Sequence, residues 1–208
     1  MNGGSRVRRS RSGPPPVERA PLKDEAMFRE LEQQVNVCVK CELSKSRTNA
    51  VFGEGAEDAR IMFIGEGPGQ EEDVQGRPFV GRAGKLLTQM LEEIGIRRED
   101  VYITNIVKCR PPGNRDPLPK ESLACRDYLM AQIAYVEPEI VCALGRVALQ
   151  ALLGQDVSIS SIHGQGQRWK GMLFVPIYHP AAGLRSASMM KGVRDDFAKL
   201  KKIIERNQ

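Results

Sequence analysis

Residues 61–84, IMFIGEGPGQEEDVQGRPFVGRAG, decide how the rest of this chain is interpreted. The first four are apolar and are followed by Gly65, a pattern typical of a short parallel strand that is buried on both faces. A glycine-rich loop comes next, and the amphipathic segment from Gly84 onward predicts a helix. In open α/β sheets, loops at the carboxyl end of a buried strand form ligand sites, because glycine lets the backbone approach a ligand closely. The stretch therefore predicts a strand, a pocket and a helix.

The side chains of this loop count against a phosphate ligand. Glu66, Glu71, Glu72 and Asp73 place four acids within eight positions, and the chain lacks both the spaced glycines of a dinucleotide-binding turn and the lysine of a P-loop. We therefore do not expect a nucleotide cofactor. Local pattern leaves two interpretations open, which are a pocket for an uncharged ligand and a surface connection whose carboxylates are simply solvated.

The segments on either side alternate between strand and helix patterns. Further strands are predicted at 101–107, 139–144 and 173–178, helices at 24–37, 119–135, 146–153 and 191–204, and a hairpin within 158–170. Such alternation predicts an α/β fold, a three-layer α/β/α sandwich around a central, mostly parallel sheet of four strands. A chain of 208 residues is long enough for one such domain, which we place at residues 25–208.

The basic charge is concentrated at the start of the chain. Of the 31 Lys and Arg residues six lie within residues 1–23, together with one of the 26 acids, so this segment carries +5 (six minus one) and the rest is neutral. Residues 1–24 contain too few apolar groups to form a core, so they predict a basic, disordered tail. Such a tail adds only loose attraction to polyanions, and the neutral body does not by itself indicate nucleic acid.

No apolar run approaches the roughly 18 residues of a membrane span, and the first residues lack the apolar region of a signal peptide, so we expect a cytoplasmic protein.

Cysteines are the clearest candidates for metal ligands. In the reducing cytoplasm cysteines favour metal binding or catalysis over disulfides. Cys38 and Cys41 form a C-x2-C pair, and fifteen residues separate Cys109 from Cys125. Four thiolates suit a zinc ion or an iron–sulfur cluster, whereas Cys142 lies in an apolar strand and is expected in the core.

Three other residues are candidates for binding or catalysis: two at the ends of predicted strands and one in a loop. His179 follows the strand at 173–178, on the same sheet edge as the glycine-rich loop, which makes it a catalytic candidate. Asn105 ends the strand pattern that precedes the proline-rich loop, and Phe79 lies in the loop before the helix at Gly84. An aromatic face and an amide together can hold and identify a nucleobase. His163, in a polar and turn-like segment, is interpreted as structural.

Over about residues 26–204 the chain resembles the family 4 uracil-DNA glycosylases, the iron–sulfur type. The resemblance is carried by separate motifs in order: GEGPGQEED (65–73), PFVGRAG (78–84), TNIVKCRPPGNR (104–115), Cys125 and HPAAGL (179–184). It implies the uracil-DNA glycosylase fold and an enzyme that flips uracil out of DNA. Hydrolysis of the N-glycosidic bond would then give free uracil and an abasic site.

The resemblance also implies which residues bind the cofactor and the base. A [4Fe-4S] cluster of structural role would be held by four thiolates: Cys38, Cys41, Cys109 and Cys125. The uracil pocket would comprise five residues: Glu66, Gly67, Phe79, Asn105 and His179. Among these, Phe79 would stack on uracil, Asn105 would pair with its edge, and His179 would donate to the O2 oxyanion of the leaving base.

Selectivity and DNA contacts are implied in the same way. Glu72 would occupy the space that the 5-methyl group of thymine needs, Leu184 would enter the DNA groove as a wedge, and Arg185 would meet a phosphate. Two residues, Glu66 and Asn114, are open candidates for positioning the attacking water. Gly67 stands where the family 1 enzymes have a water-activating aspartate, so general-base catalysis is also left open.

The partner implied by the resemblance is uracil-containing DNA, single- or double-stranded, bound by a monomer associated with the nucleoid. The short proline-rich loop at 108–119 lacks the basic, histidine-containing insertion of the related covalent uracil-binding subgroup, which favours a hydrolase. The competing hypothesis is a non-catalytic iron–sulfur or zinc protein that binds damaged DNA. Whether a sliding clamp or another repair protein binds the tail is not encoded in any pattern of this sequence.

Overall fold

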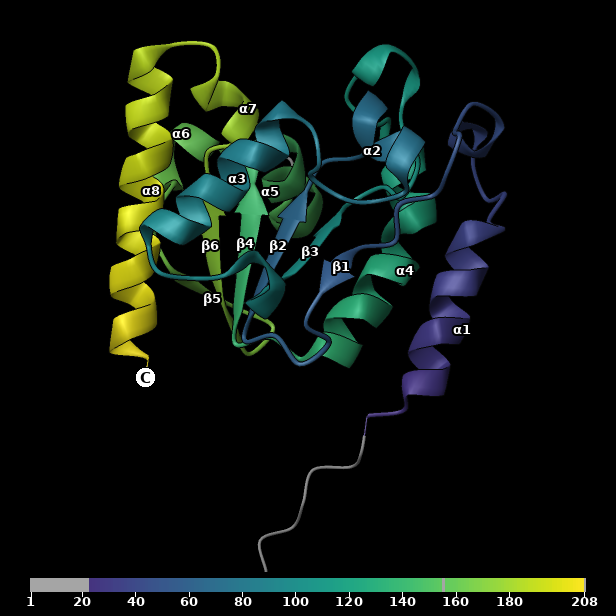
Figure 1. The fold of residues 1–208 in the computed structure, drawn as a ribbon, viewed down its shortest axis with the longest axis horizontal. Helices are drawn as coiled ribbons and strands as arrows, with labels where there is room; N and C mark the ends of the chain where they lie inside the picture. Colours follow the sequence, from purple (N-terminus) through teal and green to yellow (C-terminus); the bar gives the residue numbers. More distant parts are fainter. Residues whose placement is uncertain (1–22, 155, 208) are drawn as a thin grey trace, which may run out of the picture.

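A mixed sheet runs through the middle of the molecule in the computed structural model, which describes residues 23–154 and 156–207 (Figure 1). Within these ranges the sheet has six strands in the order β1-β3-β2-β4-β6-β5. Their bounds in that order are Glu54–Gly55, Tyr102–Asn105, Ile61–Gly65, Ile140–Leu144, Met172–Ile177 and Gln167–Trp169. The four central strands are parallel, which confirms the predicted sheet, and the two short edge strands pair antiparallel.

The edge strands differ from the sequence prediction. The hairpin expected within residues 158–170 is wrong in its extent, because β5 pairs with β6 across the two-residue turn Lys170-Gly171. Both turn residues have positive φ, 49° and 83°, the geometry that a tight two-residue hairpin requires. Residues 158–163 instead form the short helix α6 (Ile159–Ile162) and its two caps.

Helices cover both faces of the sheet and make the three layers that the sequence predicts. On one face α3 (Arg82–Glu93) and α8 (Ala187–Arg206) pack on the apolar side chains of β2, β4 and β6. On the other face lie α1 (Glu25–Asn36), α4 (Pro119–Val136) and α5 (Gly145–Leu153). Every residue of β2, β3 and β4 is buried, as expected for parallel strands covered on both sides.

Short helices occupy the segments that the sequence left as loops. Helix α2 (Gln70–Gln75) lies inside the glycine-rich loop, and α7 (Pro180–Gly183) follows β6. Helix α8 begins four residues before the predicted start, because the Ser186 hydroxyl caps it by accepting from Met189 N. The 3-10 turns η1 (Glu42–Lys45), η2 (Arg98–Asp100) and η3 (Pro112–Asn114) complete the elements.

Parallel pairing brings the carboxyl ends of the central strands to one edge of the sheet. Gly65 at the end of β2 is in register with Asn105 at the end of β3. On the other side of β2, Leu144 at the end of β4 is in register with Ile177 of β6, two residues before His179. Helices α2 and α7 lie above this edge in Figure 1. The glycine-rich loop, Asn105 and His179 therefore share one side of the molecule.

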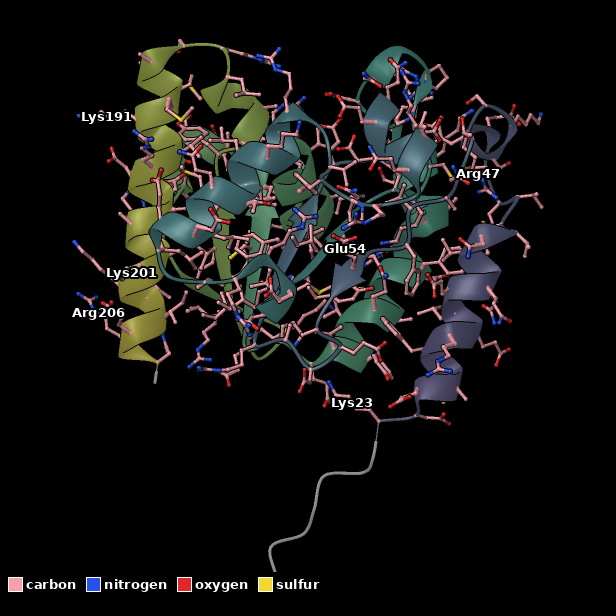
Figure 2. The ribbon with its side chains drawn as sticks, viewed as in Figure 1. Lys23, Arg47, Glu54, Lys191, Lys201 and Arg206 are labelled. Carbon is pink, nitrogen blue, oxygen red and sulfur yellow. The ribbon has the colours of Figure 1, made fainter. Side chains whose placement is uncertain are left out.

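The first described residues contact the body of the protein. Lys23, labelled in Figure 2 just before α1, donates from Nζ to the carbonyl oxygens of Glu57 and Val136 at 2.9 and 2.8 Å, and Asp24 caps α1. The predicted disordered tail at 1–24 otherwise lies outside the described residues. No helix among the described residues is both long and apolar enough to span a membrane.

Candidate active site

Asn105 ends β3 with a buried side chain that has an unpaired oxygen. Its exposure is 1%, and Oδ1 accepts no hydrogen bond from any group in the described part of the chain. A buried polar oxygen without a donor costs about 1–3 kcal/mol, so native proteins keep few of them. Such an atom is expected where a ligand supplies the missing N–H or O–H group.

Gly65 allows Asn105 and Phe79 to meet. A Cβ atom at position 65 would lie 2.5 Å from both Asn105 Oδ1 and Phe79 Cζ, which is closer than real carbon contacts allow. Phe79 is buried, and its ring stacks on the His179 ring with centroids 5.7 Å apart and an interplanar angle of 29°. The structure thus brings together three of the five residues predicted for the uracil pocket, although they come from three separate segments.

His179 is a neutral hydrogen-bond donor in this environment. It caps α7, and its Nδ1 accepts from the backbone N–H of Ala181 at 3.1 Å, so the ring proton resides on Nε2. The pKa of His179 is lowered to about 4, mainly by burial and then by the charge of Arg185, while Glu72 opposes the shift. Gly145 allows this position, because a Cβ there would lie 2.9 Å from His179 Cβ.

Glu72 fixes the shape of the loop between β2 and α3. Its Oε1 accepts from the backbone N–H groups of Val80 and Gly81 at 2.9 and 2.8 Å, and its Oε2 accepts from Gly69 at 3.1 Å. A carboxylate that accepts three backbone hydrogen bonds is held rigidly. This residue therefore forms a fixed wall beside Phe79, and its predicted role in excluding thymine stays a prediction.

Glu66 and Gly67 follow β2 directly. Gly67 lies against Val107, since a Cβ at position 67 would come within 2.7 Å of Val107 Cγ2. The pKa of Glu66 is raised to about 7, mainly by burial and then by the charge of Asp116, while Arg146 opposes the shift. A carboxyl with a pKa near neutrality can take up and release a proton under ordinary conditions.

The remaining predicted residues are exposed. Asn114 lies in η3 with φ 55°, and its Oδ1 accepts from Arg110 Nε at 2.7 Å, so this amide oxygen already has a partner. Leu184, at the end of α7, is 40% exposed, and Arg185 beside it is exposed as well. Their exposure just after His179 is consistent with a surface that meets a ligand, and their contacts with DNA stay predictions.

The four predicted metal ligands line one pocket, together with Arg47 and Tyr128. Its cysteines are Cys38, Cys41, Cys109 and Cys125. Within the described ranges no three His, Cys, Asp or Glu side chains are arranged to hold a single metal ion. A cluster of several irons is larger than one ion and is bound by thiolates spaced farther apart, so the shared pocket of the four cysteines is compatible with such a cluster.

The donors around these sulfurs suit thiolate ligands. Arg47 Nη1 donates to Cys109 Sγ at 3.0 Å, and the backbone N–H of Lys108 donates to Cys125 Sγ at 3.3 Å. Burial raises the pKa of Cys125 to about 11, and a bound cation would oppose this by favouring the thiolate. Cys142 lies apart in the core between β4 and the α3–α8 layer, as predicted.

Lys108 connects the cysteine pocket to Asn105, a role that the sequence analysis missed. Its side chain is fully buried, and Nζ donates to Thr104 Oγ1 at 2.6 Å, to the Asn105 carbonyl oxygen at 2.9 Å and to Gln132 Oε1. Burial lowers the pKa of Lys108 to about 7. The only sequence signal was a lysine next to Cys109 in an otherwise apolar strand pattern, which does not specify what the ammonium contacts.

Comparison with known proteins agrees with this geometry. The family model described as the uracil DNA glycosylase superfamily matches residues 52–206, which include Glu66, Phe79, Asn105 and His179. The chain belongs to the uracil-DNA glycosylase superfamily.

Within this superfamily the chain is similar to proteins named type-4 uracil-DNA glycosylase. The Thermotoga maritima protein is 48% identical over 186 residues, covering 88% of this chain and 97% of the relative. The Archaeoglobus fulgidus protein is 44% identical over 187 residues, covering 86% and 94%. A type-5 uracil-DNA glycosylase of Thermus thermophilus is 37% identical over 128 residues, 54% of this chain and 58% of the relative. Similarity to the type-4 proteins thus extends over more of the chain.

The state of His179 can be measured directly. Long-range proton–nitrogen NMR spectra are expected to show the neutral ring protonated at Nε2 from pH 8 down to about pH 5, with protonation only near the pKa of about 4. The chain has one other histidine, and His163→Gln assigns the two sets of signals. A proton on Nδ1 would contradict the hydrogen bond from Ala181, and a midpoint near the ordinary histidine value of about 6.5 would contradict the lowering of the pKa by burial.

Proposed function

We propose that this protein is a monofunctional DNA-repair glycosylase that flips uracil out of DNA and hydrolyses its N-glycosidic bond. The observation that carries the proposal is the buried, unpaired Oδ1 of Asn105, which lies beside the Phe79 ring at Gly65, with that ring stacked on His179. The similarity to type-4 uracil-DNA glycosylases over most of the chain supports the same reaction. The products are free uracil and an abasic site, with no strand cleavage.

Asn105 identifies the base by its hydrogen-bonding edge. Uracil presents an N–H donor at N3 beside a carbonyl acceptor at O4, and a carboxamide matches them with Oδ1 as acceptor and Nδ2 as donor. Cytosine presents the reverse pattern, so it would leave the buried oxygen of Asn105 unpaired. Phe79 stacks on the ring, and Glu72, held by its three amide donors, acts as the wall that the methyl group of thymine would strike.

His179 stabilises the leaving base. As the N-glycosidic bond lengthens, negative charge develops on the uracil ring and its oxygens, and the neutral Nε2–H of His179 donates to O2. Backbone N–H groups of the glycine-rich loop supply further donors at the same sheet edge. Each preorganised donor of this kind contributes roughly 3 kcal/mol in the transition state. Extrusion of the nucleotide opposes the reaction by a few kcal/mol of lost stacking and pairing.

Glu66 is our choice for the group that positions the attacking water. It follows β2, and its environment brings its pKa to about 7, so it is substantially ionised at neutral pH. Asn114 is the weaker candidate, because its side-chain oxygen accepts from Arg110. The sugar cation formed as uracil departs is reactive, so positioning of water is sufficient and a strong base is not required.

We further propose that the four cysteines of the pocket hold a [4Fe-4S] cluster. Cysteine thiolates are the only ligands that we assign to this group, and two of their sulfurs accept hydrogen bonds from N–H groups. Both features fit an iron–sulfur cluster. The cluster supplies structural cross-linking, since hydrolysis of an N-glycosidic bond transfers no electrons. Cys38 and Cys41, which follow α1, would thereby be tied to Cys109 of the proline-rich loop and Cys125 of α4.

The DNA is expected to lie across the carboxyl edge of the sheet. Leu184 would fill the space that the extruded nucleotide leaves, and Arg185 would bind a phosphate of the backbone. A DNA substrate is consistent with a protein that works at the nucleoid in the cytoplasm. We propose that it acts as a monomer.

Uracil release tests the function. The purified protein is expected to release uracil from U:G and single-stranded substrates, and Asn105→Ala to lower kcat/KM by about 100-fold, because two hydrogen bonds to the base are lost. The urea unfolding midpoint of Asn105→Ala should not fall greatly, since the unpaired Oδ1 makes no stabilising hydrogen bond with the described residues.

His179→Ala should lower kcat by about 100-fold or more. Asn207→Ala, at the far end of α8, serves as the control. A protein that binds these DNAs but leaves the base attached is a non-catalytic binder.

The pH profile separates Glu66 from Asn114. If the Glu66 carboxylate positions water, kcat/KM of the wild type falls about tenfold per pH unit below pH 7, where Glu66 becomes protonated. Glu66→Gln should be slow with a flat profile, whereas Asn114→Ala should keep the wild-type shape. His179, with its pKa of about 4, does not contribute in this range. The assignment to Glu66 fails if Glu66→Gln retains the drop in rate.

Metal content tests the cluster. Protein purified without oxygen is expected to contain about four irons per chain and to absorb broadly near ~400 nm. Cys125→Ala should lose both signals, whereas Cys142→Ala, a matched change in the core, should keep them. One zinc per chain in place of iron would contradict the proposal.

A further inference from the structure

Phe79 has an unusual backbone conformation for a bulky residue. Its φ of 52° is in the left-handed region, although the side chain is aromatic and 6% exposed. Residues other than glycine, asparagine and aspartate rarely adopt this region, and they remain in it only where neighbouring contacts fix the backbone. The orientation of the ring toward His179 therefore depends on groups that hold the peptides on both sides of Phe79.

The peptides after Phe79 are held by residues already described. Glu72 accepts from the N–H groups of Val80 and Gly81. Gly84, in the first turn of α3, lets the Phe79 carbonyl lie against the helix, because a Cβ there would be 1.8 Å from Phe79 O. These contacts fix the C-terminal side of the strained residue only.

The peptide before Phe79 is held by Arg98, which lies twenty residues along the chain in η2. Arg98 Nη2 donates to the Pro78 carbonyl oxygen at 2.6 Å. The rest of the guanidinium is fixed as well, since Nη1 donates to Thr88 Oγ1 at 3.2 Å and Nε and Nη2 donate to Glu54 Oε1 at 3.2 and 3.1 Å.

Glu54 makes this arrangement part of the sheet. It belongs to edge strand β1 and is labelled in Figure 2. Its carboxylate also accepts hydrogen bonds from Arg77 at 2.7 and 3.1 Å. The Arg98 side chain is 18% exposed, in contrast to the neighbouring Arg97, which is 71% exposed and pairs with Asp100. Arg98 thus connects β1, α3 and the carbonyl next to Phe79.

We propose that Arg98 is a positioning residue of the glycosylase, which holds the Pro78 carbonyl so that the Phe79 ring stays in place to stack on the base. This inference rests on the proposed function. Arg98 acts through Phe79 and has no need to touch the DNA. Its planar fork of donors bonds Pro78, Thr88 and Glu54 at once, and lysine cannot reproduce that geometry.

Kinetics of matched variants test the proposal. Arg98→Met is expected to raise KM for uracil-containing DNA about tenfold and to change kcat by less than about twofold, because stacking on the base contributes to ground state and transition state alike. Arg98→Lys should lie between Arg98→Met and wild type. Arg97→Met, the same chemical change on the adjacent residue, should behave as wild type. Equal effects of Arg97→Met and Arg98→Met on KM would overturn the proposal.

A double-mutant cycle shows whether Arg98 acts through Phe79. In a Phe79→Ala background, Arg98→Met is expected to raise KM by less than about twofold, because the ring that it positions is gone. A full tenfold effect in that background would mean that Arg98 contacts the substrate independently, which overturns the positioning role. Urea unfolding of each variant identifies losses that come from unfolding.

An activity-independent measurement separates this inference from the proposed function. Proton NOEs between the Phe79 and His179 rings are expected in the wild type and in Arg97→Met, and are expected to weaken or vanish in Arg98→Met. If the wild type releases no uracil, the proposed function fails, and the NOEs still decide whether Arg98 positions the ring. Unchanged NOEs in folded Arg98→Met would overturn the proposal.

Discussion

The close approach of Asn105 and Phe79 over Gly65 is the contact on which the candidate site depends. A single methyl group at position 65 would occupy the space where the two side chains meet. Parallel pairing of β2 with β3 puts Gly65 and Asn105 side by side, and the loop after α2 brings Phe79 over them. The candidate site is thus a consequence of sheet register and of one missing side chain.

This candidate site includes two features that are energetically unfavourable. Asn105 keeps a buried oxygen unpaired, and Phe79 keeps a left-handed backbone, each of which costs about 1–3 kcal/mol. Both features are supported by polar groups with several partners, namely Lys108 beneath Asn105 and Glu72 beside Phe79. A site that stores strain in this way is preorganised, because little rearrangement is left to be made when the base enters.

The cysteine pocket belongs to the same supporting structure. Lys108 donates from its backbone to Cys125 and from its ammonium group to the Asn105 carbonyl, so one residue connects the two regions. This connection would give the cluster that we propose a structural role, because the reaction of a glycosylase transfers no electrons. Order at the cysteines would then extend through one buried side chain to Asn105.

The sequence by itself determined the central parallel strands, the main helices that cover them, and the gathering of Asn105 and His179 at one sheet edge. Apolar runs, helical periodicity and the direction of parallel strands are local properties, so they can be predicted without coordinates. Only the tertiary structure decided the unpaired oxygen of Asn105, the Nε2 proton of His179, the helix inside the glycine-rich loop and the bond from Arg98 to Pro78. These depend on burial and on atoms brought together from distant parts of the chain, which no local pattern of residues encodes.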